Sequence, residues 1–136
     1  MSNYSIKAIS NASNDAIIQL KELNISFGIT EKTSETLPNP AELFLGSFAA
    51  CILKNVERFS GLMQFGYKKA ELLVNAVRLE NPPRMDELTY ELTIYTQDEK
   101  LNSTLLKKNI EKFGTIYNTV KQTCKISGNI IVHKNV

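Results

Sequence analysis

Hydrophobic and polar residues alternate along the first part of the chain in a pattern that predicts short strands. Residues 4–9 alternate, residues 16–20 are apolar, and residues 25–29 alternate again. The polar stretch NASND between the first two segments is typical of a turn. The segment TEKTSETLPNP that follows is polar and contains two prolines, so we expect a loop before the next element.

A long helix is predicted from residue 40 to Phe59. The sequence NPAE at residues 39–42 is a helix-start signal, in which asparagine is the N-cap, proline takes the first helical position and Glu42 closes a capping box. Gly61 is the expected end of this helix. Residues 43–53 carry no charge, so the first three turns are apolar on every side and we expect other structure to enclose them.

The second half of the chain predicts a hairpin, two helices and a last strand. Residues 72–80 and 88–95 alternate as an antiparallel pair joined by the turn NPPRMD. A helix is expected from about residue 99 to residue 113, ended by Gly114, and Thr115 is the expected N-cap of a short helix to about residue 121. The segment KISGNIIVH predicts the final strand.

The element order β-β-β-α-β-β-α-β predicts an α+β fold. We expect a single domain over residues 1–136, with antiparallel sheets wrapped around two central helices. A chain of this length fits one domain, and no repeat or flexible linker divides it.

Composition narrows the possible function classes. The chain is 43% hydrophobic and 22% charged, and its net charge of +2 comes from scattered lysines, which argues against a nucleic-acid partner. No apolar run reaches about 20 residues and no export signal is present, so we expect a cytoplasmic protein without a membrane span. Two cysteines are too few for a disulfide scaffold, and one histidine supplies a zinc or Cys-His site poorly. We therefore expect no metal and no resident cofactor.

Cys51, in the sequence FAACILK, is the residue whose chemistry needs an explanation. A cysteine among apolar neighbours more often packs as a small hydrophobe than reacts. A reactive cysteine needs a stabilised thiolate, and Lys54 and Arg58 lie on the same side of the predicted helix. These two side chains either favour the thiolate or extend into solvent.

Two segments of the chain resemble the OsmC/Ohr family. LPNPAELFLGSFAACILKNVERF is similar to the helix that carries the family's first cysteine, and NIEKFGTIYNTVK is similar to its second-cysteine segment. The resemblance covers about residues 5–134. It implies an intertwined homodimer with active sites built from both chains. It also implies reduction of organic hydroperoxides through a sulfenic acid, which a second cysteine resolves before an external thiol, of lipoyl or thioredoxin type, restores the enzyme.

The resemblance implies a role for one residue of this chain directly and leaves three others as candidates. Cys51 matches the peroxide-attacking cysteine, whereas Gly114 stands at the position of the resolving cysteine. Cys124, ten residues later, is not equivalent to that cysteine; it is a candidate resolving thiol only if it reaches Cys51, and a free cysteine at the edge of a strand more often simply packs. Lys32 is the basic residue nearest to the family's N-terminal arginine, and Glu42 lies one residue after the position of the family's catalytic glutamate.

Two functions remain open at this stage. The first is thiol-dependent reduction of organic or lipid hydroperoxides through Cys51 alone, resolved by an external thiol. The second is a non-catalytic protein that binds a small apolar molecule at the dimer interface, with Cys51 as packing. Several apolar side chains are candidates to line such a pocket, although ordinary core packing explains them as well: Phe44, Phe48, Phe59, Met63 and Phe65.

Overall fold

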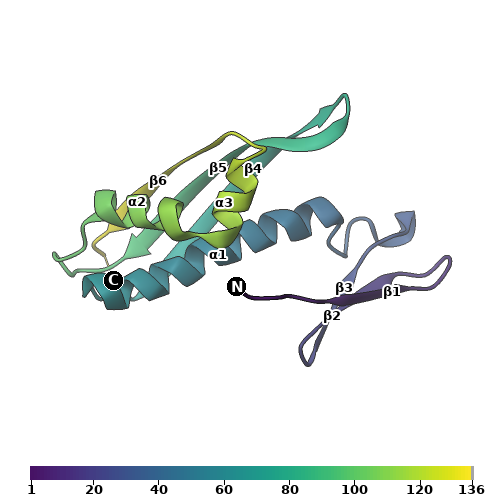
Figure 1. Ribbon diagram of the computed structural model, residues 1–136, viewed down its shortest axis with the longest axis horizontal. Helices are drawn as coiled ribbons and strands as arrows, with labels where there is room; N and C mark the ends of the chain where they lie inside the picture. The colour runs from purple at the N-terminus through teal and green to yellow at the C-terminus, as the bar shows by residue number, and fades with distance from the viewer. Residues whose placement is uncertain (136) are drawn as a thin grey trace. The chain divides into compact units, whose positions relative to one another are not determined.

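The computed structural model describes residues 1–135, and the chain divides into two compact units. Unit 1 comprises Met1–Phe44, and unit 2 begins at Leu45. The ribbon in Figure 1 follows the order of elements along the chain. The α+β class and the predicted order of strands and long helices are confirmed.

Unit 1 contains a three-stranded antiparallel sheet in the order β1-β2-β3. Its strands are β1 (Lys7–Ser10), β2 (Ala16–Leu20) and β3 (Leu23–Phe27). The first strand begins later than the predicted residue 4, and the third begins before residue 25. The third strand begins early because Lys21 adopts a φ of 54°, which allows a two-residue turn that pairs Leu20 with Leu23.

Helix α1 (Pro40–Met63) begins in unit 1 with the predicted capping box. The backbone N–H of Asn39 donates to Glu42 Oε1 at 3.1 Å, and the N–H of Glu42 donates to Asn39 Oδ1 at 2.8 Å. The expected end at Gly61 is wrong, because the helix continues to Met63. Gln64 follows with a φ of 57°, so it takes the left-handed position that often ends a helix.

The sheet of unit 2 has the order β4-β5-β6 and is mixed rather than wholly antiparallel. Strands β4 (Lys69–Glu80) and β5 (Pro83–Tyr95) form an antiparallel hairpin, and β6 (Ile126–His133) pairs parallel to β5. Parallel pairing follows from the helical crossover between β5 and β6, which returns the chain to the starting end of the sheet. The hairpin turn is also tighter than the predicted NPPRMD, because Glu80 already pairs with Pro83.

Two helices form the crossover, α2 (Ser103–Phe113) and α3 (Thr115–Lys121). Helix α2 begins four residues later than expected, because Asp98 holds the preceding segment in a turn through the N–H groups of Gly66 and Lys100. Asn102 then caps the helix by accepting from Leu105 at 3.0 Å. Thr115 is not the N-cap of α3, since Gly114 occupies that position without a side-chain cap.

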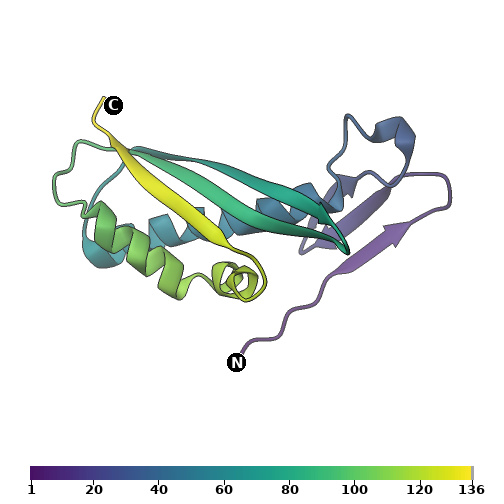
Figure 2. The ribbon, with the colours of Figure 1, turned by 90° about the horizontal axis from the view of Figure 1, so that it is seen from above.

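The core of unit 2 lies between one face of its sheet and the helices (Figures 1 and 2). Alternate residues of β5 are buried there, and the other face of the sheet is exposed. The fully buried side chains come from α1, β5 and α2, and comprise Phe48, Ile52, Val56, Leu88, Leu92, Ile94, Leu106 and Ile110.

The opposite side of α1 is exposed within unit 2. Gly46, Ala50 and Leu53 follow one another at helical spacing and are all exposed. Within the described part of unit 2 no other element covers these three residues, so enclosure of the helix on every side stays a prediction. None of the helices in the described residues has the length and apolar character needed to cross a membrane.

Candidate functional site

Cys51 lies on α1 with its side chain half-buried, opposite the junction of α2 and α3. Gly114 forms that junction and is buried. A Cβ placed on Gly114 would lie 3.1 Å from the Cys51 sulfur, and 3.0 Å from both the Ile110 carbonyl oxygen and the Tyr117 Cβ. The sulfur therefore packs directly against the main chain at residue 114, where a larger side chain has little room.

Asn55, one turn after Cys51, donates to it twice. The Asn55 Nδ2 lies 2.9 Å from the Cys51 carbonyl oxygen and 3.8 Å from the Cys51 sulfur. The side chain is buried, with the residue only 8% exposed. Residues four apart share a helix face, so the amide and the thiol face the same side of α1.

Three aromatic rings pack together at the α2–α3 junction that contacts this sulfur. The ring of Phe48, one turn before Cys51, stacks on Tyr117 with centroids 5.7 Å apart and meets Tyr90 of β5 at 6.5 Å. These three rings fix the α2–α3 junction against α1 and the sheet. Of the candidate pocket-lining residues, Phe48, Phe59 and Phe65 are buried in the core, which agrees with the core-packing alternative.

The carboxylate of Glu111 binds two polar side chains, one of which belongs to the aromatic residue Tyr90. Glu111 Oε2 accepts from the Tyr90 hydroxyl at 2.7 Å and from Lys107 Nζ at 2.9 Å. Burial and the neighbouring carboxylate raise the pKa of Tyr90, and the same two causes raise the pKa of Tyr117 to about 12. Burial opposes ionisation of Glu111, but hydrogen bonds from Lys107 and Tyr90 outweigh it and lower the pKa of that carboxyl.

The two basic residues expected near Cys51 differ in their surroundings. The guanidinium of Arg58 lies 5.3 Å from the ring centroid of Phe59 and 5.9 Å from that of Phe113. Its charge therefore stacks on aromatic faces. Lys54 is exposed.

Cys124 lies between α3 and β6, and its neighbours differ from those of Cys51. Its sulfur donates to the Met85 carbonyl at 3.3 Å and lies 3.6 Å from the Thr123 hydroxyl. Both cysteines are free thiols. Gly114, not Cys124, supplies the contact with the Cys51 sulfur, and a resolving role for Cys124 stays a prediction.

Lys32 and Glu42 belong to unit 1, and their predicted roles at Cys51 stay predictions. Lys32 is exposed in the short helix η1 (Glu31–Thr33). Asp15 holds this loop, since its Oδ1 accepts from the Thr33 hydroxyl at 2.6 Å and from the Thr30 hydroxyl at 3.2 Å. The bond from Thr33 is the main cause that lowers the pKa of Asp15.

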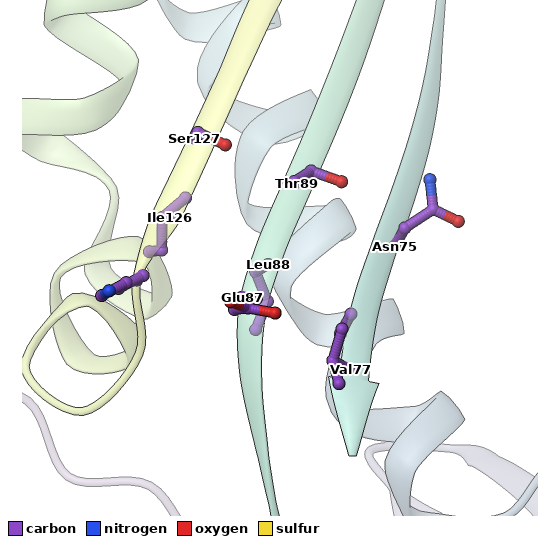
Figure 3. A pocket seen from close by; sticks show the side chains of 9 residues that line it. Asn75, Val77, Glu87, Leu88, Thr89, Ile126 and Ser127 are labelled. Carbon is purple, nitrogen blue, oxygen red and sulfur yellow. The ribbon is translucent and has the colours of Figure 1, made fainter. Parts of the chain in front are cut away.

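A cavity of about 700 Å³ in unit 2 lies away from Cys51, on the sheet (Figure 3). Asn75, Thr89 and Ser127 border it from three adjacent strands and are exposed. None of the predicted site residues lines this cavity. Within residues 1–135, no group of three or more His, Cys, Asp or Glu side chains is arranged to hold a metal ion.

Comparison with known proteins identifies the family. Residues 32–128 match the family described as OsmC-like protein. The chain belongs to the OsmC-like family. No curated protein matches this sequence.

Solved structures of OsmC-like proteins share the fold over nearly the whole chain. An OsmC-like protein from Mycoplasma pneumoniae is 20% identical with a TM-score of 0.83, over 98% of this chain and 99% of that one. An organic hydroperoxide resistance protein OsmC from Legionella pneumophila is 13% identical with a TM-score of 0.69, over 97% and 100%. The organic hydroperoxide resistance protein OhrB of Bacillus subtilis is 14% identical with a TM-score of 0.62, over 93% and 98%.

Sequence reasoning missed Asn55 and Glu111. The sequence did indicate Asn55, because a polar residue four positions after a cysteine shares its helix face. The sequence did not indicate the role of Glu111, since this residue contacts Tyr90 only once α2 has packed on the sheet.

Proposed function

We propose that this OsmC-like protein reduces organic hydroperoxides through Cys51, as part of a general response to peroxide stress. The observation that carries the proposal is the contact between the Cys51 sulfur and Gly114. It joins in space the two segments that resemble the first- and second-cysteine motifs. Family membership and the hydroperoxide-resistance names of the Legionella and Bacillus structures support the same reaction class.

The chemistry requires a thiolate at Cys51. This thiolate attacks one oxygen of the hydroperoxide, an S–O bond forms and the O–O bond breaks. The sulfur loses two electrons and becomes a sulfenic acid. The departing alkoxide takes a proton from water and leaves as the alcohol.

Resolution falls to an external thiol, because Gly114 offers none. The first external thiol condenses with the sulfenic acid, which releases water and forms a mixed disulfide with Cys51. A second thiol attacks this mixed disulfide, frees the Cys51 thiol and leaves as part of an external disulfide. A dithiol of lipoyl or thioredoxin type supplies both thiols in one molecule, so we propose a reductant of this kind.

A second copy of the chain completes the proposed enzyme. The exposed face of α1 at Gly46, Ala50 and Leu53 consists of small and apolar side chains, next to the helix face that carries Cys51. A homodimer that covers this face would shield the site from water. Lys32 and Glu42, from either copy, are the proposed charged groups of such a site.

The test treats purified protein with cumene hydroperoxide and a sulfenic-acid trap, followed by intact-mass analysis. We expect one adduct on the wild type and on Cys124→Ser, and no adduct on Cys51→Ser. Peroxide consumption with dihydrolipoamide should follow the same pattern. An unmodified Cys51 together with no peroxide consumption by the wild type would overturn the proposal.

The alternative is a non-catalytic protein that binds a small apolar molecule. The exposed apolar side chains of unit 2 favour it, namely Leu53, Leu62, Leu105 and Phe113. It predicts that Cys51→Ser leaves binding of an apolar fluorescent probe unchanged and that the wild type forms no sulfenic acid.

A further inference from the structure

The amide of Asn55 is aimed at the sulfur of Cys51 from a buried position. Its Nδ2 lies 3.8 Å from the sulfur, within the range of an N–H···S hydrogen bond, and the residue is 8% exposed. Burial of an amide in a helix interior is unfavourable unless its hydrogen bonds are made, so this orientation is held by its acceptors.

The Nδ2 atom of Asn55 carries two hydrogens. Both of its acceptors, a carbonyl oxygen and a sulfur, belong to Cys51. The carbonyl oxygen of Cys51, at 2.9 Å, takes one hydrogen in the way that polar side chains often bond to the carbonyl four residues back. The second hydrogen is then available to the sulfur. The first bond fixes the amide plane, and this fixed plane keeps the second donor beside the thiol.

We propose that Asn55 is a positioning residue that stabilises the Cys51 thiolate by donating a hydrogen bond to its sulfur. This inference rests on the proposed function and deepens it, because it names the group that favours the reactive form. A donor stabilises the charged acceptor more than the neutral one, so the thiolate gains relative to the thiol.

Charged groups on the elements around Cys51 are occupied or exposed. On α1, Arg58 stacks on aromatic rings and Lys54 is exposed. On α2, Glu111 binds Tyr90 and Lys107, and the Lys112 ammonium lies 5.2 Å from the Phe113 ring centroid. Of the other ionisable groups on α2 and α3, Lys108 and Lys121 are exposed, and the buried Tyr117 hydroxyl bonds Glu111. The amide of Asn55 is therefore the donor that the structure assigns to the sulfur.

The test measures the rate of iodoacetamide alkylation of Cys51 against pH in the full-length protein, with Cys124→Ser as background. Asn55→Ala should move the midpoint of this profile upward by about one pH unit, and so lower the rate about tenfold at pH values below the midpoint. Asn55→Asp, which keeps the size but loses the donor and adds negative charge, should move it further. If Asn55→Ala fails to fold, Asn55→Asp carries the test.

Asn109→Ala is the matched control. Asn109 on α2 also donates its amide to a sulfur, but to that of Met63, at 3.6 Å. It should leave the alkylation profile unchanged. An unshifted profile in folded Asn55 variants would overturn the inference.

Hydroperoxide consumption in the same proteins separates the two proposals. A shifted alkylation profile in the Asn55 variants, with no peroxide reduction by the wild type, would contradict the proposed function but support the role of Asn55. Peroxide reduction by the wild type with an unshifted profile in the variants would support the proposed function and contradict the role of Asn55.

Discussion

Gly114 lies against the sulfur of Cys51, and a Cβ at this residue would be at the distance from that sulfur that a disulfide requires. A Cβ on residue 114 would be 3.1 Å from this sulfur. In a disulfide, the Cβ of one cysteine lies about 3.0 Å from the sulfur of the other, as its bond lengths dictate. The position is thus suited to a second cysteine, although the chain has none there.

Gly114→Cys should convert the site into one that forms its own disulfide. In a Cys124→Ser background, cumene hydroperoxide should oxidise Cys51, and the thiol introduced at position 114 should condense with it. Intact mass should then fall by about 2 Da, and no sulfenic-acid adduct should accumulate. Reduction by a dithiol should reverse the change.

Gly114→Ala is the control for this substitution. The new methyl group would lie 3.0 Å from the Ile110 carbonyl oxygen and the Tyr117 Cβ, so the backbone has to shift. We expect a loss of about 1–3 kcal/mol in the free energy of unfolding. A persistent sulfenic acid in Gly114→Cys, with no disulfide, would contradict the observed proximity.

A second glycine, Gly128 in β6, allows the Tyr90 ring to lie over its backbone. The two residues are paired across β5 and β6, and a Cβ on Gly128 would overlap the Cδ1, Cε1 and Cζ atoms of the ring. The ring is fixed by burial and by the bond from its hydroxyl to Glu111. Gly128→Ala should therefore lower the free energy of unfolding by about 1–3 kcal/mol in a urea titration.

Gly61→Ala should have the opposite effect on the free energy of unfolding, measured in the same urea titration. Gly61 lies inside α1, and apart from its chain neighbours and the backbone of its own helix no described atom lies within 4 Å of the Cβ that it would gain. Alanine favours a helix interior over glycine by about 0.5–1 kcal/mol, so this variant should be slightly more stable than the wild type. Equal effects of the two substitutions would show that the ring contact does not restrict residue 128.

The carboxylate of Glu42 has a structural role that can be separated from catalysis. Glutamine closes a capping box as glutamate does, but it has no charge. Glu42→Gln should therefore keep the thermal stability of the wild type but consume peroxide more slowly, because it loses the charge proposed for the site, whereas Glu42→Ala should in addition lose about 0.5–2 kcal/mol of stability. Thermal unfolding by circular dichroism and a peroxide assay measure the two effects. Peroxide consumption by Glu42→Gln equal to that of the wild type would instead restrict Glu42 to its capping role.

Much of the fold was predictable because its signals are local. The capping box at Asn39 and Glu42, the alternation of β5 and the glycine at residue 114 all act within a few residues. The predictions were wrong where residues distant in the sequence determine the local structure. Asp98 delays the start of α2 by bonding Gly66, which is remote in sequence. The parallel pairing of β6 likewise depends on how the crossover packs.

The candidate site was predictable only in part. The family motifs pointed to Cys51, and the structure placed Gly114 beside it. The hydrogen bond from Asn55 depends on a side-chain rotamer, and the contacts of Arg58 depend on where Phe113 lies. Neither follows from spacing alone, since a residue four or seven positions away can also point into solvent.

Ala50→Arg should disrupt the proposed homodimer. Ala50 is exposed on the apolar face of α1, and a buried arginine without a partner is unfavourable in an interface. We expect the wild type to have the mass of a dimer in light scattering coupled to size-exclusion chromatography, and the variant that of a monomer. Thr104→Arg, at an exposed position of α2, should remain dimeric. A monomeric wild type would contradict the dimer.

Glu111 should contribute stability that depends on pH. Hydrogen bonds from Lys107 and Tyr90 lower its pKa in the folded state relative to its ordinary value of 4.5. The unfolded chain then binds the proton more tightly, so the contribution is present above about pH 4.5 and is lost as the pH falls through the folded pKa. Glu111→Gln should be less stable than the wild type at pH 7, and the difference should shrink in acid. Urea titrations from pH 7 to about pH 3 measure it. A difference that is independent of pH would show that the charge of Glu111 does not stabilise the fold.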